Sequence, residues 1–150
     1  MPTKRTLKAA RKDKREGKSP STQAGEFVRE EIEHVREGKH GARSAKQAIA
    51  IGLSKARRAG VALKPPKKGR ASEATRESAR DALRAGRTKG ASARPSARRS
   101  RATTRALKRE GHAAASETAL ARHAREAARE RTAGERSASA RKAAATRKRK

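Results

Sequence analysis

The stretch SAKQAIAIGLSKARRAG, residues 44–60, has the clearest structural pattern in the chain. Its first residue, Ser44, can cap a helix, and Gln47 stands three residues later, as a capping box requires. Alanine, isoleucine and leucine then recur at helical spacing. Gly60 lies where a left-handed residue commonly ends a helix, and two prolines follow soon after. We therefore expect a helix between Ser44 and Gly60.

A second amphipathic helix is expected just before this one. Ser19 followed by Pro20 is typical of a helix start, and Gly38 of a helix end. Joined by residues 38–43, the two helices form an αα-hairpin, which we place within residues 21–66. Its expected core consists of six apolar side chains: Phe27, Val28, Ile32, Val35, Ile49 and Leu53. A unit this small is marginally stable, so we expect it to become ordered on binding or self-association.

Composition limits what the rest of the chain can do. Only 13 of the 150 residues are Leu, Ile, Val or Phe, whereas 34 are Ala. A chain with so few large apolar residues and so much charge cannot bury a large core. The predicted fold class is all-α. The hairpin is flanked by a basic, disordered arm at residues 1–20 and by an Arg/Ala-rich tail at residues 67–150, whose short helices pack loosely or are disordered.

The charge of the chain points to a polyanionic partner. Lys and Arg number 43 against 15 Asp and Glu, a net charge of +28, of which residues 67–150 carry +18. Cations that neutralise phosphates release counterions, which gives affinity without sequence preference. Arg outnumbers Lys by 27 to 16, and its planar guanidinium suits phosphate and the narrow minor groove of DNA. A single aromatic residue leaves few stacking platforms of the kind that RNA and single-strand binders use.

The residues expected to contact nucleic acid are clusters of cations in the arm, the second hairpin helix and the tail. They are Lys12, Lys14, Arg15, Lys46, Lys55, Arg57, Arg58, Lys67, Lys68, Arg70, Arg98, Arg99, Arg101, Arg105, Lys108, Arg109, Arg141, Lys142, Arg147, Lys148, Arg149 and Lys150. The hairpin could itself be a helix-turn-helix, but its six-residue connection is longer than the usual turn. Simple hairpin packing or dimerisation is therefore favoured.

The first hairpin helix is unusually acidic. Five glutamates fall within it: Glu26, Glu30, Glu31, Glu33 and Glu37. Because Arg29 and Arg36 lie three residues from Glu26 and Glu33, an exposed, salt-bridged helix face is expected. The alternative is that this face meets a basic tail and tunes access to DNA.

No catalytic or metal-binding pattern stands out. The four histidines, His34, His40, His112 and His123, are scattered, and the chain has no cysteine, so no metal site is expected. Glycine-rich phosphate-binding motifs and nucleophile motifs are absent from the sequence. We therefore expect neither an enzyme nor a cofactor nor a small-molecule substrate.

The sequence also bears on location. The longest apolar run, residues 48–53, is far shorter than the roughly 20 residues that span a bilayer. No apolar segment follows the basic N-terminus, so secretion is not expected. The predicted location is the cytoplasm, at the nucleoid.

Residues 46–60 carry the pattern KQAIAI-x-LS-x-AR-x-AG, which resembles a motif of short, basic, uncharacterised bacterial and phage proteins. The resemblance extends over residues 27–64, and longer members have a similar Arg/Ala tail. It implies no established activity, since members are at most loosely described as DNA-binding. The tail composition also looks like that of linker-histone arms, although those are rich in Lys and Pro.

The expected function is binding of double-stranded DNA through its phosphates, without sequence preference, as a nucleoid-associated or histone-like protein. Two alternatives remain open. The first is association with RNA or the ribosome, because A-form backbones attract the same charges. The second is a protein-interaction hairpin whose basic tails only localise it.

Overall fold

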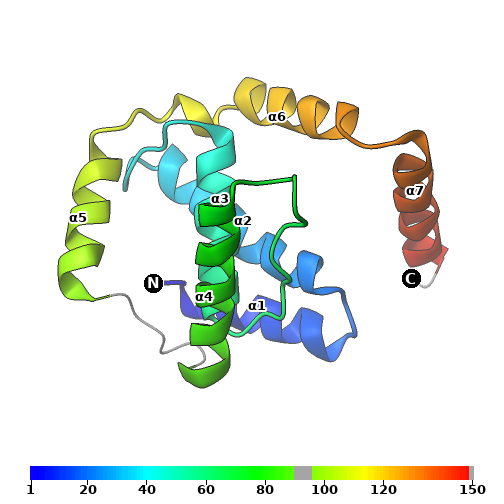
Figure 1. Cartoon of the computed structure of the whole chain (residues 1–150), viewed down its shortest axis with the longest axis horizontal. Helices are drawn as coiled ribbons and strands as arrows, with labels where there is room; N and C mark the ends of the chain where they lie inside the picture. The colour runs from blue at the N-terminus through cyan, green and yellow to red at the C-terminus, as the bar shows by residue number, and fades with distance from the viewer. Residues whose placement is uncertain (90–95, 149–150) are drawn as a thin grey trace.

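The computed structural model describes residues 1–89 and 96–148, and it confirms the all-α class (Figure 1). The helices within the described residues are α1 (Lys4–Arg15), α2 (Pro20–Arg36), α3 (Ala45–Arg58), α4 (Glu73–Lys89), α5 (Ala97–Lys108), the 3₁₀ helix η2 (Ala113–Ala115), α6 (Glu117–Arg129) and α7 (Ala133–Lys148). None of them is long and apolar enough to cross a membrane.

The expected hairpin is formed by α2 and α3, and its caps are those that the sequence predicts. The backbone N–H of Thr22 donates to Ser19 Oγ, and that of Gln47 donates to Ser44 Oγ at 3.2 Å. The Gln47 amide oxygen accepts from the N–H of Arg43 instead of that of Ser44, so the capping box closes one residue early. At the other end, Gly60 has a φ of 91°, the left-handed conformation expected of it.

The two hairpin helices cross at Gly52. A Cβ atom placed on Gly52 would lie 2.7 Å from Cα of Val28 and 3.0 Å from the carbonyl oxygen of Phe27. Only glycine fits at this distance, because the atoms it faces belong to the backbone and cannot rotate away. Gly52 therefore sets how closely α2 and α3 pack.

The core consists of two small clusters built mainly from alanine. Phe27 is 1% exposed and packs with alanines of α1, α2 and α3 and with Val61. Val35 is fully buried and packs with Ala48 of α3 and with Ala115 of η2. Ile32 and Leu53 lie partly buried against these clusters, and Val28 and Ile49 are also partly buried. All six predicted core residues are therefore at least partly buried in the hairpin, and Phe27 and Val35 are fully buried.

Residues 1–20 differ from the disordered arm that the sequence suggests. Residues 4–15 form α1, and Ala10 of this helix packs in the cluster around Phe27. The N–H of Thr3 donates to Glu30 Oε1 at 2.8 Å, which ties the start of α1 to α2. The buried face of α1 consists of Thr6, Ala10 and Asp13, side chains that are too small or too polar to give an apolar pattern.

The folded unit also extends past the predicted boundary at residue 66. Helix α4 packs against α3 through Ala79, Ala82 and Gly86, all of them buried. A Cβ atom on Gly86 would lie 1.9 Å from the carbonyl oxygen of Arg57. The first helix of the predicted tail is therefore a fourth helix of the core, beside α1, α2 and α3.

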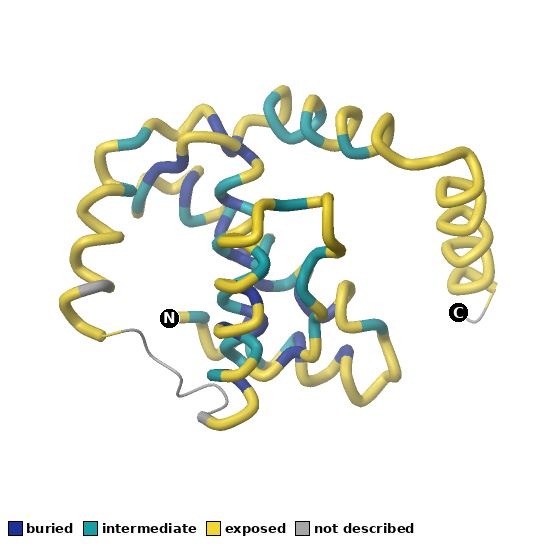
Figure 2. The backbone as a smooth tube through the Cα atoms, viewed as in Figure 1, coloured by how far each residue is buried: buried dark blue, intermediate teal, exposed yellow. Residues whose placement is uncertain are grey.

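Of the remaining helices, η2 belongs to this core and α6 contacts α3 and η2, whereas α5 and α7 stand away from it. Helix α5 is joined to it near its C-terminal end, where the N–H of Gly41 donates to Leu107 O and that of Ala42 donates to Gly111 O. Every residue of α7 is exposed (Figure 2). The accessible surface of 11026 Å² exceeds by about half the roughly 7,500 Å² expected for a compact 16.2 kDa chain. Much of the chain therefore faces solvent with its charges.

Candidate nucleic-acid interface

Helix α5 is strongly cationic. Its sequence, ARRSRATTRALK, contains five cations and no carboxylate. Arg101, Arg105 and Lys108 recur at helical spacing, and Arg109 follows on the same side. Together with Ser100 and Thr104 they line an open groove of about 520 Å³, which we call the α5 groove. An anion entering it meets guanidinium and ammonium donors on one side of a helix.

The cations of the α5 groove are not neutralised within the molecule. Among the described residues, no carboxylate oxygen lies within 4.0 Å of Arg101, Arg105, Lys108 or Arg109. Many other surface cations are paired, for example Arg80 with Glu73 and Arg84 with Asp81, each at 3.0 Å. The charge of the α5 groove is therefore available to an outside partner.

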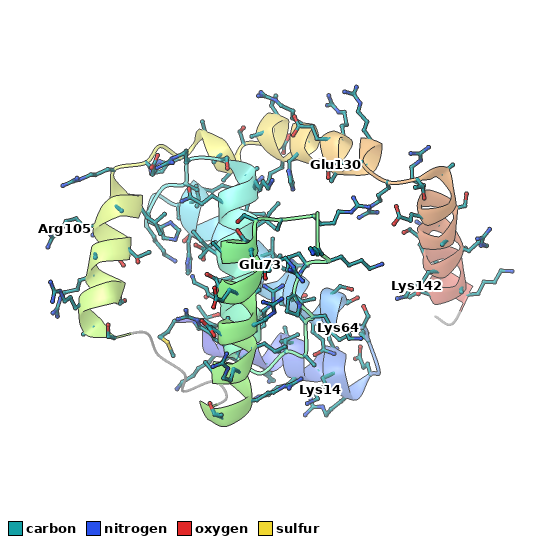
Figure 3. The ribbon with its side chains drawn as sticks, viewed as in Figure 1. Lys14, Lys64, Glu73, Arg105, Glu130 and Lys142 are labelled. Carbon is teal, nitrogen blue, oxygen red and sulfur yellow. The ribbon has the colours of Figure 1, made fainter. Side chains whose placement is uncertain are left out.

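Helices α6 and α7 form a second cationic surface, which we call the α6–α7 arm. It leads away from the α2–α3 hairpin and ends in α7 (Figure 1). Arg141, Lys142, Arg147 and Lys148 of α7 are exposed and form no ion pair within the described part of the chain. Figure 3 shows Arg105 on α5 and Lys142 on α7, on opposite sides of the molecule. The cations thus surround the core and do not converge on one cleft.

The structure gives two of the predicted phosphate-binding residues other roles. Arg57 is 7% exposed, and its guanidinium donates to the carbonyl oxygens of Leu63 at 3.0 Å and Lys64 at 3.2 Å. It holds the segment after α3 in place, and burial lowers the pKa of Arg57. Lys55 forms an ion pair with the buried Glu31. The residue type of a cation does not reveal its burial, so the sequence could not separate these two from the rest.

The other predicted residues are mostly exposed. Lys14, Arg15, Lys46, Lys67, Lys68 and Arg98 are exposed, and Arg58 is partly buried. Lys12 pairs with Glu16, and Arg70 pairs with Glu135, both at 3.7 Å. The side chain of Arg99 and the residues Arg149 and Lys150 lie outside what the structure describes.

Sequence reasoning also missed cations on α6. Arg122, Arg125 and Arg129 are exposed and lie three and four residues apart, so they share one face of that helix. This helical spacing could have identified them as a basic face from the sequence alone. They extend the basic surface from α5 toward α7.

The acidic helix face is only partly as expected. Glu26 pairs with Arg29 at 3.7 Å, as predicted, but Glu30 is 5% exposed and Glu31 is fully buried. Arg36 donates from Nε to the carbonyl oxygen of Ala115. Buried carboxylates need polar partners, and α1, α3 and the 38–43 turn supply them. The prediction of an exposed, salt-bridged face is therefore wrong in part, because Glu30 and Glu31 of this acidic face are buried.

Near Glu31 the structure assembles a group that the sequence did not suggest. His34 and His40 lie beside this carboxylate, with His40 Nε2 at 3.2 Å from Glu31 Oε1. Burial, followed by the positive charges of Lys55 and Lys39, lowers the pKa of His34. The i, i+3 spacing of Glu31 and His34 was a signal for part of this group, whereas the approach of His40 depends on the turn.

Comparison with known protein families finds a match for one part of the chain. No curated protein and no solved structure matches the chain. Residues 11–68, from the second half of α1 to just beyond α3, match the model of a family described as a family of unknown function, DUF6496. The hairpin and its surroundings are thus similar to that family, whereas α4 to α7 lie outside the match.

Proposed function

We propose that this protein binds double-stranded DNA through the phosphate backbone, without sequence preference, as a nucleoid-associated, histone-like factor. The observation that carries the proposal is the α5 groove. Its four cations are exposed, and none of them forms an ion pair with another described residue. Three of them project from α5, which carries no carboxylate, and Arg109 directly follows that helix. Such a surface has a high affinity for a polyanion because each phosphate it neutralises releases condensed counterions.

The dimensions of the α5 groove suit a nucleic-acid backbone. From Arg101 to Arg109 the helix rises about 12 Å, at roughly 1.5 Å per residue. That length is close to the width of the major groove of B-DNA, about 12 Å, so the cations can reach several phosphates at its edges. Guanidinium groups bind phosphate in a bidentate way, which favours the three arginines for this role.

The placement of the one aromatic residue supports duplex over single-stranded nucleic acid. Phe27 is 1% exposed in the hairpin core, so it offers no face on which a base could stack. Proteins that bind single strands rely on such faces. Recognition here rests on charge and backbone shape, which a double helix presents continuously.

The α6–α7 arm adds to this binding by reaching further along the duplex. Helix α7 makes no buried contact, and an isolated helix of 16 residues is only marginally stable in water. Neutralisation of its cations by phosphates removes their mutual repulsion and favours the helix. We therefore expect the helicity of the protein to rise when it binds DNA.

The test compares two variants that lose the same charge. The first replaces the unpaired cations of the α5 groove: R101Q, R105Q, K108Q and R109Q. The second replaces four exposed cations that already pair with carboxylates: K12Q, R29Q, R80Q and R84Q. Binding of a labelled DNA duplex is measured by fluorescence anisotropy over a series of salt concentrations.

The proposal predicts that the two variants differ in their salt dependence. The slope of log K against log salt should fall in magnitude by roughly 3 to 4 in the α5 variant, at about 0.9 per lost phosphate contact. The paired variant should lose less than about 1, because its cations were already neutralised. Equal losses in both would show that only net charge matters. An RNA duplex that outcompetes the DNA would favour the RNA alternative.

A further inference from the structure

A cluster of metal-ligating side chains lies at the end of α2, and none of its residues lines the α5 groove. Glu31 and His34 project from consecutive turns of this helix, and His40 comes from the turn that follows it. One ligand atom of each lies within 4.8 Å of the others. Glu31 is fully buried, and both histidines are partly buried.

The polar groups of this cluster are incompletely satisfied. Glu31 Oε1 is buried and accepts no hydrogen bond, although His40 Nε2 is only 3.2 Å away. His40 Nδ1 lies 3.0 Å from the carbonyl oxygen of Gly41. Because a carbonyl oxygen only accepts, Nδ1 donates this hydrogen bond, and Nε2 is the ring nitrogen that faces the carboxylate. A buried carboxylate oxygen without a hydrogen bond, beside an imidazole nitrogen, is a pair of atoms that a metal ion can bind.

We propose that Glu31, His34 and His40 bind a divalent transition-metal ion, with Zn²⁺ the best match. Imidazole nitrogen and carboxylate oxygen are ligands that Zn²⁺ commonly takes. The hydrogen bond from His40 Nδ1 to Gly41 fixes the ring as outer partners of metal-bound histidines do. This proposal is independent of DNA binding.

The surroundings leave room for a further ligand. The three side chains line a cavity of about 530 Å³, whose lining also includes Ser100 and Thr104 of α5. Three protein ligands with a fourth position open to a cavity is the arrangement of reactive zinc centres, whereas structural sites are closed by four. Zinc bonds of about 2.0 to 2.1 Å place tetrahedral ligand atoms roughly 3.3 Å apart, so small side-chain rotations close the site.

The side chain of Lys55 places a positive charge beside this cluster. Its ammonium contacts the second oxygen of Glu31, and its side chain is 24% exposed. A positive charge in that place stabilises the buried carboxylate, and it also repels a metal ion. The metal therefore competes with Lys55, and removing the ammonium should strengthen metal binding.

The experiment titrates the full-length protein with Zn²⁺ by calorimetry and follows Co²⁺ binding by visible absorption. The wild type should bind one ion per chain. E31Q and H40Q should each weaken binding by at least about tenfold, because each removes a direct ligand. H123Q is the matched control, since His123 lies on α6, outside the cluster.

K55Q provides a result that misfolding cannot imitate. It should bind Zn²⁺ at least about tenfold more tightly than the wild type, through loss of the neighbouring charge. Circular dichroism of each variant checks that the helices persist. The inference is overturned if neither the wild type nor K55Q binds one ion per chain. It is also overturned if E31Q and H40Q bind as well as H123Q, since the metal then sits elsewhere.

Discussion

The close packing of α2 against α3 at Gly52 predicts that an alanine there lowers the free energy of unfolding, although alanine normally stabilises a helix. Gly52→Ala places a methyl group 2.7 Å from Cα of Val28. Because the neighbouring atoms belong to the backbone of α2, the clash can be relieved only by moving the helices apart. Overpacking of this kind costs about 1 to 3 kcal/mol, and the rigid backbone neighbours place it near the upper end. Alanine gains about 1 kcal/mol over glycine in a helix. The free energy of unfolding should therefore fall by about 2 kcal/mol.

Gly25→Ala is the matched control, because Gly25 lies inside α2 as Gly52 lies inside α3, but a Cβ at Gly25 meets nothing within 4 Å. It should raise the free energy of unfolding by up to about 1 kcal/mol. Both variants are measured by urea unfolding followed by circular dichroism, with linear extrapolation to water. If Gly52→Ala stabilised the protein as Gly25→Ala does, the helices could not cross at Gly52 and the described core would be wrong.

Two further predictions test other parts of the core. Gly86→Ala should lower the free energy of unfolding by at least about 1 kcal/mol, because its Cβ would meet the carbonyl oxygen of Arg57; an increase in stability would mean that α4 does not pack on α3. Arg57→Gln should cost about 2 to 4 kcal/mol by losing two hydrogen bonds from a charged donor. The same variant should leave the salt slope of DNA binding unchanged, and a fall of about 1 in that slope would return Arg57 to the phosphate-binding residues.

The sequence predicted the hairpin well because its signals are local. Caps at Ser19 and Ser44 and the left-handed Gly60 depend on neighbouring residues alone. The packing of α1 and α4 depends on close approach of small residues such as Ala10 and Gly86, which leave no apolar pattern. These two helices were therefore assigned to a disordered arm and a loose tail.

The cationic surfaces and the Glu31 cluster show the same difference between features set by local sequence and features set by contacts between distant residues. The exposure of the described cations of α5 and α7 follows from their sequences, because a helix with so few large apolar residues has little to bury. The burial of Arg57 and Lys55, and the meeting of Glu31 with His40, depend on how α2, α3 and the 38–43 turn pack. Such contacts between distant residues cannot be derived from spacing.

The central claim is that unpaired cations on α5 and the α6–α7 arm neutralise the phosphates of duplex DNA. The most direct test is the salt dependence of binding of the full-length protein to unrelated DNA duplexes. The account predicts similar affinities for all of them and a log–log slope steeper than about −3. A shallower slope, or no binding near physiological salt, would contradict it.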